Sequence, residues 1–374
     1  MKEFYFFNKK ISTLGKTWKS IKDDDYRISQ LQKKYSISRL FATILSKKKI
    51  ELTEYNNYLF PTIKKNLPDP YTLLNMREAV LFLYENIKAK NKIGLLGDYD
   101  VDGASSTALI YNYFKYLNVK PEIYIPDRIR DGYGICKKGI DYFKKKNVTL
   151  LIAFDCGSND YELIQYAKKN KINAIVLDHH EIKSKEPDAI VVNPKNILDK
   201  SGLKFLATVG ISFLFAVALQ RVLKENKYFK NENVPDLKQF LDLVALGTIS
   251  DLVPLIGLNR VLVKKGIKQI NTKSNYSIAY LANEINLKDK ITSTDIAFYL
   301  GPCINASGRV GCSKSGFDLL TIENKNRLKD TTDQLIINNL ERKTLESLAL
   351  KDAEEIIRIK YNKNNNKFIL VFSN

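Results

Sequence analysis

The chain is poor in several residue types that would mark a common class of protein. Its four cysteines, Cys136, Cys156, Cys303 and Cys312, are widely spaced and include no C-x-x-C pair, so neither a disulfide framework nor a thiolate zinc site is indicated. No apolar run is long enough to cross a bilayer, and the first residues lack the apolar stretch of a secretory signal. We therefore expect a cytoplasmic protein with reduced thiols and no membrane segment.

Acidic residues are the minority among the charged side chains. The 374 residues include 60 Lys and Arg but 41 Asp and Glu, which gives a formal net charge of +19. Such an excess attracts polyanions, and nucleic acid is the leading partner class. Lysine, asparagine and isoleucine are abundant throughout the chain, so part of the excess also fits a solvated lysine coat with no binding role.

From residue 92 onward, short apolar runs alternate with segments of helical character. The runs are KIGLLGDYD, EIYIPD, TLLIAFD and NAIVLDHH. Buried strands that alternate with helices predict an α/β fold, a parallel sheet with helices on both faces. We place this domain at residues 91–326, after a helical, lysine-rich N-terminal extension at residues 1–90.

The sequence of the C-terminal part predicts one long helix and, after it, the start of a second lobe. Residues 327–360 form an amphipathic connecting helix in this interpretation, with Leu335, Leu340, Leu345 and Leu348 among its apolar positions. A polar linker, KYNKNNNK, and the apolar run FILVF follow, and FILVF predicts a strand. Because one strand cannot make a domain, we expect residues 361–374 to begin a truncated second lobe.

Carboxylates and the only two histidines follow the predicted strands. Asp98, Asp100 and Asp102 come after the first run, Asp155 after another, and Asp178, His179 and His180 after a third. The carboxyl ends of parallel strands share one edge of a sheet, where ligands bind. A single acidic stretch would more simply cap a helix, but three strand ends with such residues favour a common site.

Clustered carboxylates repel one another unless cations neutralise them. Carboxylates together with imidazole suit Mn²⁺ or Mg²⁺, and an aspartate shared between two ions is typical of two-metal phosphoryl chemistry. The sequence therefore predicts a site for two divalent cations, Mn²⁺ or Mg²⁺. One histidine would be a ligand, while its neighbour would meet a substrate phosphate. Asp251, which follows an apolar helix in GTISDLVP, would by itself be an ordinary helix cap.

With these residues in view, the chain resembles the DHH phosphoesterase family from about Ser38 to its C-terminus. GDYDVDG looks like the first family motif, FDCGSND the second, LDHHE the third and LGTISDLVPL the fourth, in the same order and with similar spacing. The stretches LFPTIKKNLPDP, IPDRIRDGYG, VVNP and LGPCINASGR further resemble the single-strand-specific DNA exonucleases of that family.

The resemblance implies a role for each residue of the site. Asp98, Asp100 and Asp155 would hold one ion, and Asp102, Asp155, His179 and Asp251 would hold the other. The catalytic residues would be Asp155, which bridges the ions, and His180 and Arg309, which contact the substrate phosphate. Arg128, Tyr133, Asn305 and Arg309 would bind substrate, the arginines because a guanidinium matches phosphate oxygens.

The implied activity is metal-dependent hydrolysis of single-stranded DNA from its 5′ end to mononucleotides, in DNA repair and recombination. A monomer that works with a single-strand-binding protein and a helicase is part of the same expectation. Two departures keep alternatives open. Cys303 stands where the family usually carries arginine, which removes a positive charge near the expected substrate path, and the second lobe and oligonucleotide-binding barrel are missing. A phosphodiesterase of short oligonucleotides or cyclic dinucleotides, and a truncated non-catalytic DNA-binding protein, are therefore the alternatives.

Overall fold

The computed structural model describes residues 11–12, 14–17, 22–48, 50–183, 185–229, 234–287, 290–360 and 369–372. The chain divides into two compact units, Met1–Lys65 and Asn66–Asn374. Four short helices make up the described part of the first unit: α1 (Asp25–Tyr35), α2 (Arg39–Ser46), α3 (Tyr55–Leu59) and α4 (Ile63–Asn66), the last of which ends at the boundary. Their small core contains Ile28, Leu31, Ala42, Leu45 and Tyr55.

The second unit is built on a five-stranded sheet. Its strands are β1 (Ile93–Gly97), β2 (Glu122–Tyr124), β3 (Leu150–Phe154), β4 (Asn173–Leu177) and β5 (Ile190–Val192). All neighbours are parallel, in the order β2-β1-β3-β4-β5. Every residue of β1 and β3 is buried, as expected where helices cover both faces of a sheet.

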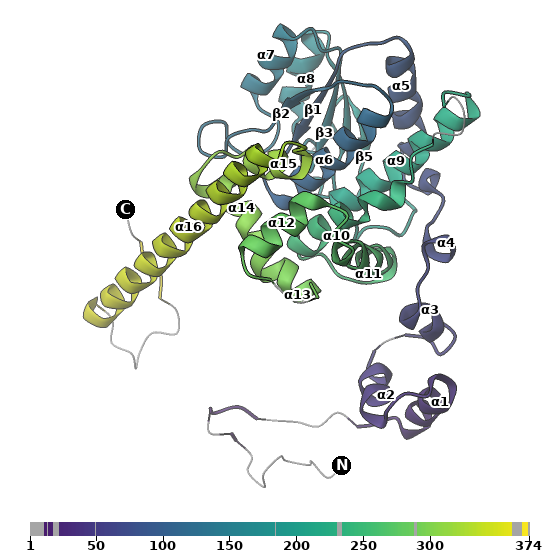
Figure 1. Cartoon of the computed structure of the whole chain (residues 1–374), viewed down its shortest axis with the longest axis vertical. Coiled ribbons are helices and arrows are strands. Elements are labelled where there is room, and N and C mark those ends of the chain that lie inside the picture. Colours follow the sequence, from purple (N-terminus) through teal and green to yellow (C-terminus); the bar gives the residue numbers. More distant parts are fainter. Residues whose placement is uncertain are drawn as a thin grey trace. The chain divides into compact units, whose positions relative to one another are not determined.

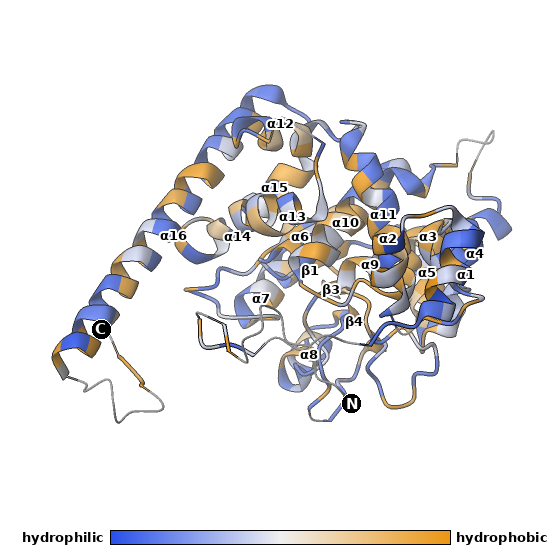
Figure 2. Ribbon diagram, turned by 90° about the horizontal axis from the view of Figure 1, so that it is seen from below, coloured by the Kyte–Doolittle hydropathy of each residue, from blue (hydrophilic) through white to orange (hydrophobic). Residues whose placement is uncertain are grey.

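Helices cover the sheet on both faces, as the sequence predicts (Figure 1). The helices α7 (Lys137–Lys145) and α8 (Tyr161–Lys169) pack on one face, where their apolar side chains share a core with Leu96, Leu151 and Val176. The helices α5 (Met76–Lys88), α6 (Val101–Tyr116) and α9 (Thr208–Glu225) lie on the other face. Figure 2 shows the hydrophobic strands between these two layers.

A helical layer follows α9 in the chain. Its members are η3 (Leu237–Phe240), α10 (Leu241–Ser250), α11 (Gly257–Asn271), α12 (Tyr276–Glu284), α13 (Ser293–Asp295), η4 (Ile296–Leu300), α14 (Gly301–Val310) and α15 (Ser315–Thr321). A short turn, η2 (Pro70–Thr72), precedes α5. The apolar helix α10 packs against α6, α9 and α11, and is buried on all sides. It therefore carries the residue that caps its C-terminus, Asp251, to the sheet edge from the helical layer.

The long helix predicted near the C-terminus is α16 (Lys325–Lys360). It packs on α14 and α15 through its first half, where Leu328 and Leu335 are buried. Leu340, Leu345 and Leu348, which the sequence also places on an apolar face, are each more than half exposed. No helix among the described residues is both long and apolar enough to cross a membrane.

The predicted strand at FILVF is wrong for the residues that the structure describes. Ile369–Phe372 form no strand, and Leu370 and Phe372 are exposed. A strand needs a partner edge for its backbone groups, and none of the five strands pairs with this segment. An apolar, β-branched run does not by itself supply that edge.

Candidate metal centre at the carboxyl edge of the sheet

The register of three neighbouring strands places side by side the residues that directly follow each strand. Gly97 pairs with Phe154, and Phe154 with Leu177, so β1, β3 and β4 end at the same level. The residues that follow these ends are Asp98, Asp155 and Asp178. The meeting of these three strand ends, which the sequence predicts, is therefore a direct result of the parallel register.

The acidic stretch after β1 turns at once into helix α6. Asp100 is its N-cap, and its Oδ1 accepts a hydrogen bond from the Gly103 backbone N–H at 2.9 Å. A Cβ atom on Gly103 would lie 2.5 Å from the carbonyl oxygen of Asp98, so only glycine fits this close start of the helix. Asp100 therefore caps a helix, as a single acidic stretch would, and it also belongs to the carboxylate cluster.

Asp102 and Asp155 are fully enclosed carboxylates. Asp102 lies in the first turn of α6 and accepts hydrogen bonds from the backbone N–H groups of Thr208 at 2.7 Å and Val209 at 2.9 Å. Asp155 has a left-handed backbone, with φ of 63°, which aspartate tolerates better than most residues. Its Oδ1 accepts a hydrogen bond from the Thr208 hydroxyl at 2.9 Å, and its carbonyl accepts one from the Tyr133 hydroxyl at 2.9 Å.

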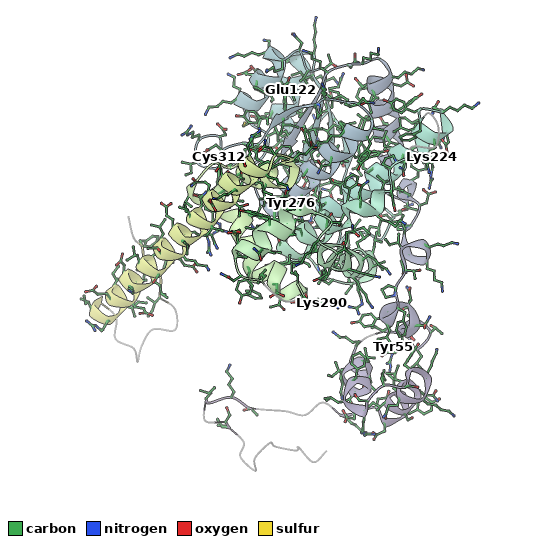
Figure 3. The ribbon with its side chains drawn as sticks, viewed as in Figure 1. Tyr55, Glu122, Lys224, Tyr276, Lys290 and Cys312 are labelled. Atoms are coloured by element: carbon green, nitrogen blue, oxygen red, sulfur yellow. The ribbon has the colours of Figure 1, made fainter. Side chains whose placement is uncertain are left out.

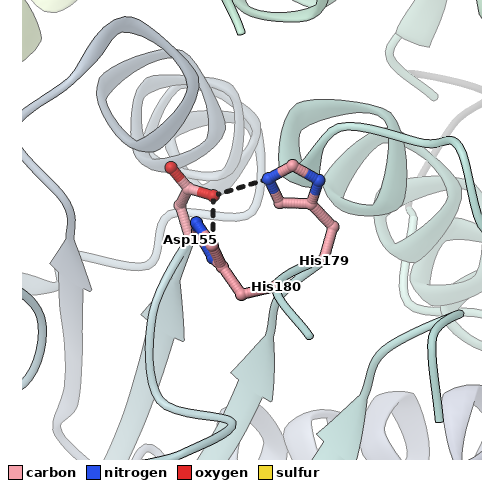
Figure 4. A group of neighbouring side chains, drawn as sticks. All are labelled: Asp155, His179 and His180. Atoms are coloured by element: carbon pink, nitrogen blue, oxygen red, sulfur yellow. Dashed lines mark ion pairs between the residues drawn. The ribbon is translucent and has the colours of Figure 1, made fainter. Parts of the chain in front are cut away.

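His179 points its imidazole into the carboxylate cluster. Its Nε2 lies 3.4 Å from Asp155 Oδ1, 3.4 Å from Asp251 Oδ2 and 4.0 Å from Asp102 Oδ2. Figure 4 shows Asp155 between the two histidine rings. Since Asp251 comes from the end of α10, the cluster joins the sheet edge to the helical layer.

His180 faces a different partner from its neighbour. Its Nδ1 donates to Asp178 Oδ1 at 2.8 Å, and the Tyr133 hydroxyl lies 3.3 Å from the same ring. Asp178 also accepts hydrogen bonds from the backbone N–H groups of both histidines and of Ser158. The two rings, with centroids 4.8 Å apart, both lie near Asp155 Oδ1, but the hydrogen bond to the Asp178 carboxylate is made by the ring of His180.

Burial and mutual repulsion perturb the acids of the cluster. Burial and the charge of Asp100 raise the pKa of Asp98 to about 7 and that of Asp251 to about 6. Burial and the neighbouring carboxylates also raise the pKa values of Asp102 and Asp155. These acids need a nearby positive charge to be ionised together near neutral pH.

The pKa values of the two histidines shift in opposite directions, and that of Asp178 falls. Burial and the neighbouring His180 lower the pKa of His179 to about 4, so it is neutral and its ring nitrogen is free to bind a cation. Burial alone would raise the pKa of Asp178, but the hydrogen bonds from His180 and Ser158, together with the charge of His180, lower it to about 2. The bond between His180 and Asp178 raises the pKa of His180, so a cationic ring is favoured there.

Three buried polar atoms of the cluster have no hydrogen-bond partner within the described residues: Asp98 Oδ1, His179 Nε2 and Asp251 Oδ2. An unpaired buried acceptor or imidazole nitrogen costs about 1–3 kcal/mol, and such atoms in a native protein call for an explanation. A divalent cation supplies one, because carboxylate oxygens and neutral imidazole are its ordinary ligands.

The geometry offers three overlapping sets of ligand atoms, each within 4.8 Å of one another. They are Asp98, Asp100 and Asp155; Asp102, His179 and Asp251; and Asp155, His179 and His180. Asp155 belongs to the first and third sets and His179 to the second and third, while the set of Asp102, His179 and Asp251 does not include Asp155. All six residues expected to bind metal are thus brought together.

The four residues expected to bind substrate lie around the same edge, with mixed roles. The Arg128 guanidinium lies 5.3 Å from the centre of the Tyr99 ring, and the charges of Arg128 and Arg309 both act on the Tyr99 hydroxyl. Asn305 instead accepts a hydrogen bond from the Val101 N–H at 2.9 Å, so its side chain supports the loop after β1. Tyr133 likewise has a structural role through its bond to Asp155.

A cavity of about 850 Å³ adjoins the carboxylate cluster. His179, His180 and Asp251 line one end of it, and Lys195, Lys204, Phe205 and Leu252 are among its other lining residues. Two lysines and exposed apolar side chains beside an anionic cluster can hold a phosphate chain that carries flat, apolar groups. The cavity therefore gives access to His179, His180 and Asp251, which line it.

The structure places Cys303, which stands where the resembled family usually carries arginine, in the interior of the protein. Cys303 is buried in α14, and burial raises the pKa of its thiol to about 11. Cys136 and Cys156 are also buried, and only Cys312, labelled in Figure 3, is exposed. The Cys303 position is part of the packing of α14 in this chain.

Two further residues of the site, and the role of a third, were missed from the sequence. Thr208 is far from the acidic motifs along the chain, and no local pattern marks it. Tyr99 stands inside the acidic stretch itself, and an aromatic residue between two acids could have been singled out. Asp178 was recognised as a strand-end acid, but its role in holding His180 was not.

A family model, the N-terminal domain of the DHH family, matches residues 92–248. The single-stranded-DNA-specific exonuclease RecJ of Salmonella typhimurium is 35% identical over 282 residues, which are 73% of this chain and 48% of that protein. RecJ of Haemophilus influenzae is 33% identical over 289 residues, which are 76% of this chain and 50% of that protein. The chain therefore spans about half the length of the curated relatives it matches.

Two solved structures agree with these matches. A crystal structure of exonuclease RecJ bound to manganese superposes with a TM-score of 0.67 and 30% identity, and the match covers 75% of this chain and 69% of that one. RecJ of Thermus thermophilus in complex with Mn²⁺ gives a TM-score of 0.70 with 25% identity, over 88% of this chain and 46% of that one. Sequence and fold agree, and the chain belongs to the DHH family and, within it, to the RecJ group.

Proposed function

We propose that the chain is a metal-dependent exonuclease that hydrolyses phosphodiester bonds of single-stranded DNA. The observation that carries the proposal is the convergence of six acidic and imidazole ligands, with three buried atoms that lack a partner among the described residues. The names of the relatives supply the substrate: single-strand-specific exonucleases, with a RecJ structure that contains manganese.

In this proposal two divalent cations, Mn²⁺ or Mg²⁺, occupy the cluster. One lies among Asp98, Asp100 and Asp155, and the other among Asp102, Asp155, His179 and Asp251, with Asp155 shared. When bound, such ions stabilise the attacking and leaving oxygens of an in-line displacement at phosphorus. The buried carboxylates repel one another, and such ions would neutralise their charges.

His180 is the proposed contact to the scissile phosphate. Asp178 orients its ring and favours its protonated form, so the side chain presents a cation to the non-bridging oxygens. Arg128 and Arg309, which gather around Tyr99, would add guanidinium contacts. Loss of one such preorganised donor typically lowers the rate on the order of 10²-fold.

The cavity beside the cluster is the proposed path for the strand. Lys195 and Lys204 would follow the phosphate backbone, while Phe205 offers a face on which a base can stack. Digestion from the 5′ end to mononucleotides remains part of the proposal, as do action as a monomer in the cytoplasm and cooperation with a single-strand-binding protein and a helicase.

The test is digestion of end-labelled single strands, with duplex DNA as the control substrate. We expect release of mononucleotides from single strands in Mn²⁺ or Mg²⁺ and none in EDTA, and opposite end labels report the polarity. A dinucleotide substrate, cleaved in preference to the long strand, would instead favour a phosphodiesterase of short oligonucleotides. Binding of single strands without cleavage, in an otherwise metal-loaded protein, would favour the non-catalytic alternative, which the half-length match to the relatives keeps open.

A further inference from the structure

The N-terminus of α9 contacts two carboxylates of the cluster through one residue. Thr208 is the first residue of α9 and is fully buried. Its backbone N–H donates to Asp102 Oδ2 at 2.7 Å, and its hydroxyl donates to Asp155 Oδ1 at 2.9 Å. Asp102 lies in the first turn of α6 and Asp155 follows β3, so Thr208 links the start of a helix to the end of a strand.

The backbone contact replaces the usual helix cap. The N-cap residue of α9, Ala207, has no side chain that could accept a hydrogen bond from the first turn. Asp102 from α6 accepts the N–H groups of Thr208 and Val209 in its place. Substitution of the Thr208 side chain leaves these backbone bonds in place, so the hydroxyl can be tested separately from the cap.

The hydroxyl contact acts on the carboxylate with the central position. Asp155 Oδ1, which accepts the Thr208 hydroxyl, also lies 3.4 Å from His179 Nε2 and 3.9 Å from His180 Nδ1. The hydrogen bond from the hydroxyl fixes the orientation of the Asp155 carboxylate oxygens toward the cluster.

We propose that Thr208 is a positioning residue of the metal centre: its hydroxyl holds Asp155 in the rotamer that binds the shared ion. The inference rests on the proposed function, since it requires that the cluster bind divalent cations. It adds a residue that no motif of the sequence marks. Partners that orient a metal ligand in this way typically contribute about 10–100-fold to metal affinity.

The test compares Thr208→Val with Thr208→Ser in the full chain. Valine has the branched shape of threonine without the donor, and serine keeps the donor without the methyl group. The readout is the affinity for Mn²⁺ alone, measured from the free-ion signal in electron paramagnetic resonance. We expect Thr208→Val to bind Mn²⁺ about 10–100-fold more weakly, and Thr208→Ser to bind as the unsubstituted chain does.

Thermal unfolding in EDTA separates positioning from a plain packing role. A packing role alone predicts a lower Tm for Thr208→Val with unchanged Mn²⁺ affinity, and that result would overturn the inference. Equal weakening by valine and serine would also overturn it, because the hydroxyl would not be the cause. If the unsubstituted chain itself binds no Mn²⁺, the proposed function fails first and the inference fails with it. If the unsubstituted chain and Thr208→Val bind Mn²⁺ equally well, the inference about Thr208 is wrong but the proposed function stands.

Discussion

His179 Nε2 and Asp251 Oδ2 lie 3.4 Å apart, and neither atom has a hydrogen-bond partner in the described part of the chain. The first comes from the end of a strand and the second from the end of α10. Their closeness without a bond is the geometry expected of two ligands that face one cation. Packing of α10 against α6 and α9 is what brings them together.

Asp251→Asn tests this pair. The amide is a poorer ligand than the carboxylate and cannot be ionised, so we predict that Mn²⁺ binding weakens roughly tenfold or more. In EDTA the same variant should be at least as stable as the unsubstituted chain, because a buried, repelled charge is gone. Thermal unfolding with and without Mn²⁺ measures both effects.

Asp242→Asn is the matched control. Asp242 is a buried acid of the same helix α10, and burial raises its pKa to about 6, yet it lies outside the three ligand sets. Its substitution should leave the Mn²⁺-dependent rise in Tm unchanged. If both variants lose the Mn²⁺-dependent rise in Tm equally, α10 is sensitive to any substitution. The assignment of Asp251 as a metal ligand would then be wrong.

The stability of the metal-free protein should depend on pH in an unusual direction. Asp98 and Asp251 have folded-state pKa values of about 7 and about 6, above the value of about 3.9 for an unfolded aspartate. Between about pH 4 and 7 the folded protein therefore holds protons that the unfolded chain has released, so the free energy of unfolding falls as pH rises. His179, with a pKa of about 4, opposes this trend below about pH 6.5 but is one group against several.

Bound cations reverse the trend, because they favour the ionised acids. We predict that the difference in Tm between Mn²⁺ and EDTA grows from about pH 5 to about pH 7.5. Thermal unfolding at a series of pH values measures it. A difference that is constant with pH would mean that the acids are already ionised without metal.

The fold could be predicted from the sequence because its elements are marked locally. Apolar runs followed by acids predicted four of the five strands, and the parallel register then aligned their ends. The fifth strand, Ile190–Val192, is a three-residue edge strand like β2, but Asn193 and not an acid follows it, so it lacks the signal that marked the other four. FILVF shows the reverse error, since an apolar run without a neighbouring edge forms no strand in Ile369–Phe372.

The sequence predicted the residues of the site that lie in recognisable motifs, but not those that tertiary packing brings in. Residues at strand ends were found because topology alone brings them together, and Asp251 was found through the family resemblance. Thr208 depends on where α9 begins relative to Asp102 and Asp155, which is a matter of tertiary packing. Asn305 was expected to bind substrate, yet the structure shows its carbonyl holding the Val101 backbone, a contact that no sequence pattern reports.

The two histidines should titrate far apart in the metal-free protein. Burial lowers the pKa of His179 to about 4, while the bond to Asp178 raises that of His180 above its ordinary value of about 6.5. Since the chain has only these two histidines, NMR of the imidazole C–H groups resolves both without ambiguity.

Asp178→Asn tests the cause of the shift at His180. An amide is neutral, so we predict that the pKa of His180 falls and that the signal of His179 keeps its low pKa. The activity at neutral pH should drop by about 10–100-fold, because the ring is no longer oriented and charged. An unchanged pKa of His180 would show that Asp178 does not control it.

The double substitution Lys195→Ala with Lys204→Ala tests the path beside the cluster. Two lost phosphate contacts should weaken binding of single-stranded DNA and lower the slope of log affinity against log salt by about 1.4, at about 0.7 per contact. The control is Lys88→Ala with Lys90→Ala, since these lysines line a separate cavity with Lys92 and Lys120, away from the ligand sets. The net charge of both double variants is the same, so a general effect of the +19 charge would weaken both equally. Binding measured by fluorescence anisotropy in Ca²⁺ or EDTA, over a range of salt, therefore distinguishes a defined path from a diffuse lysine coat.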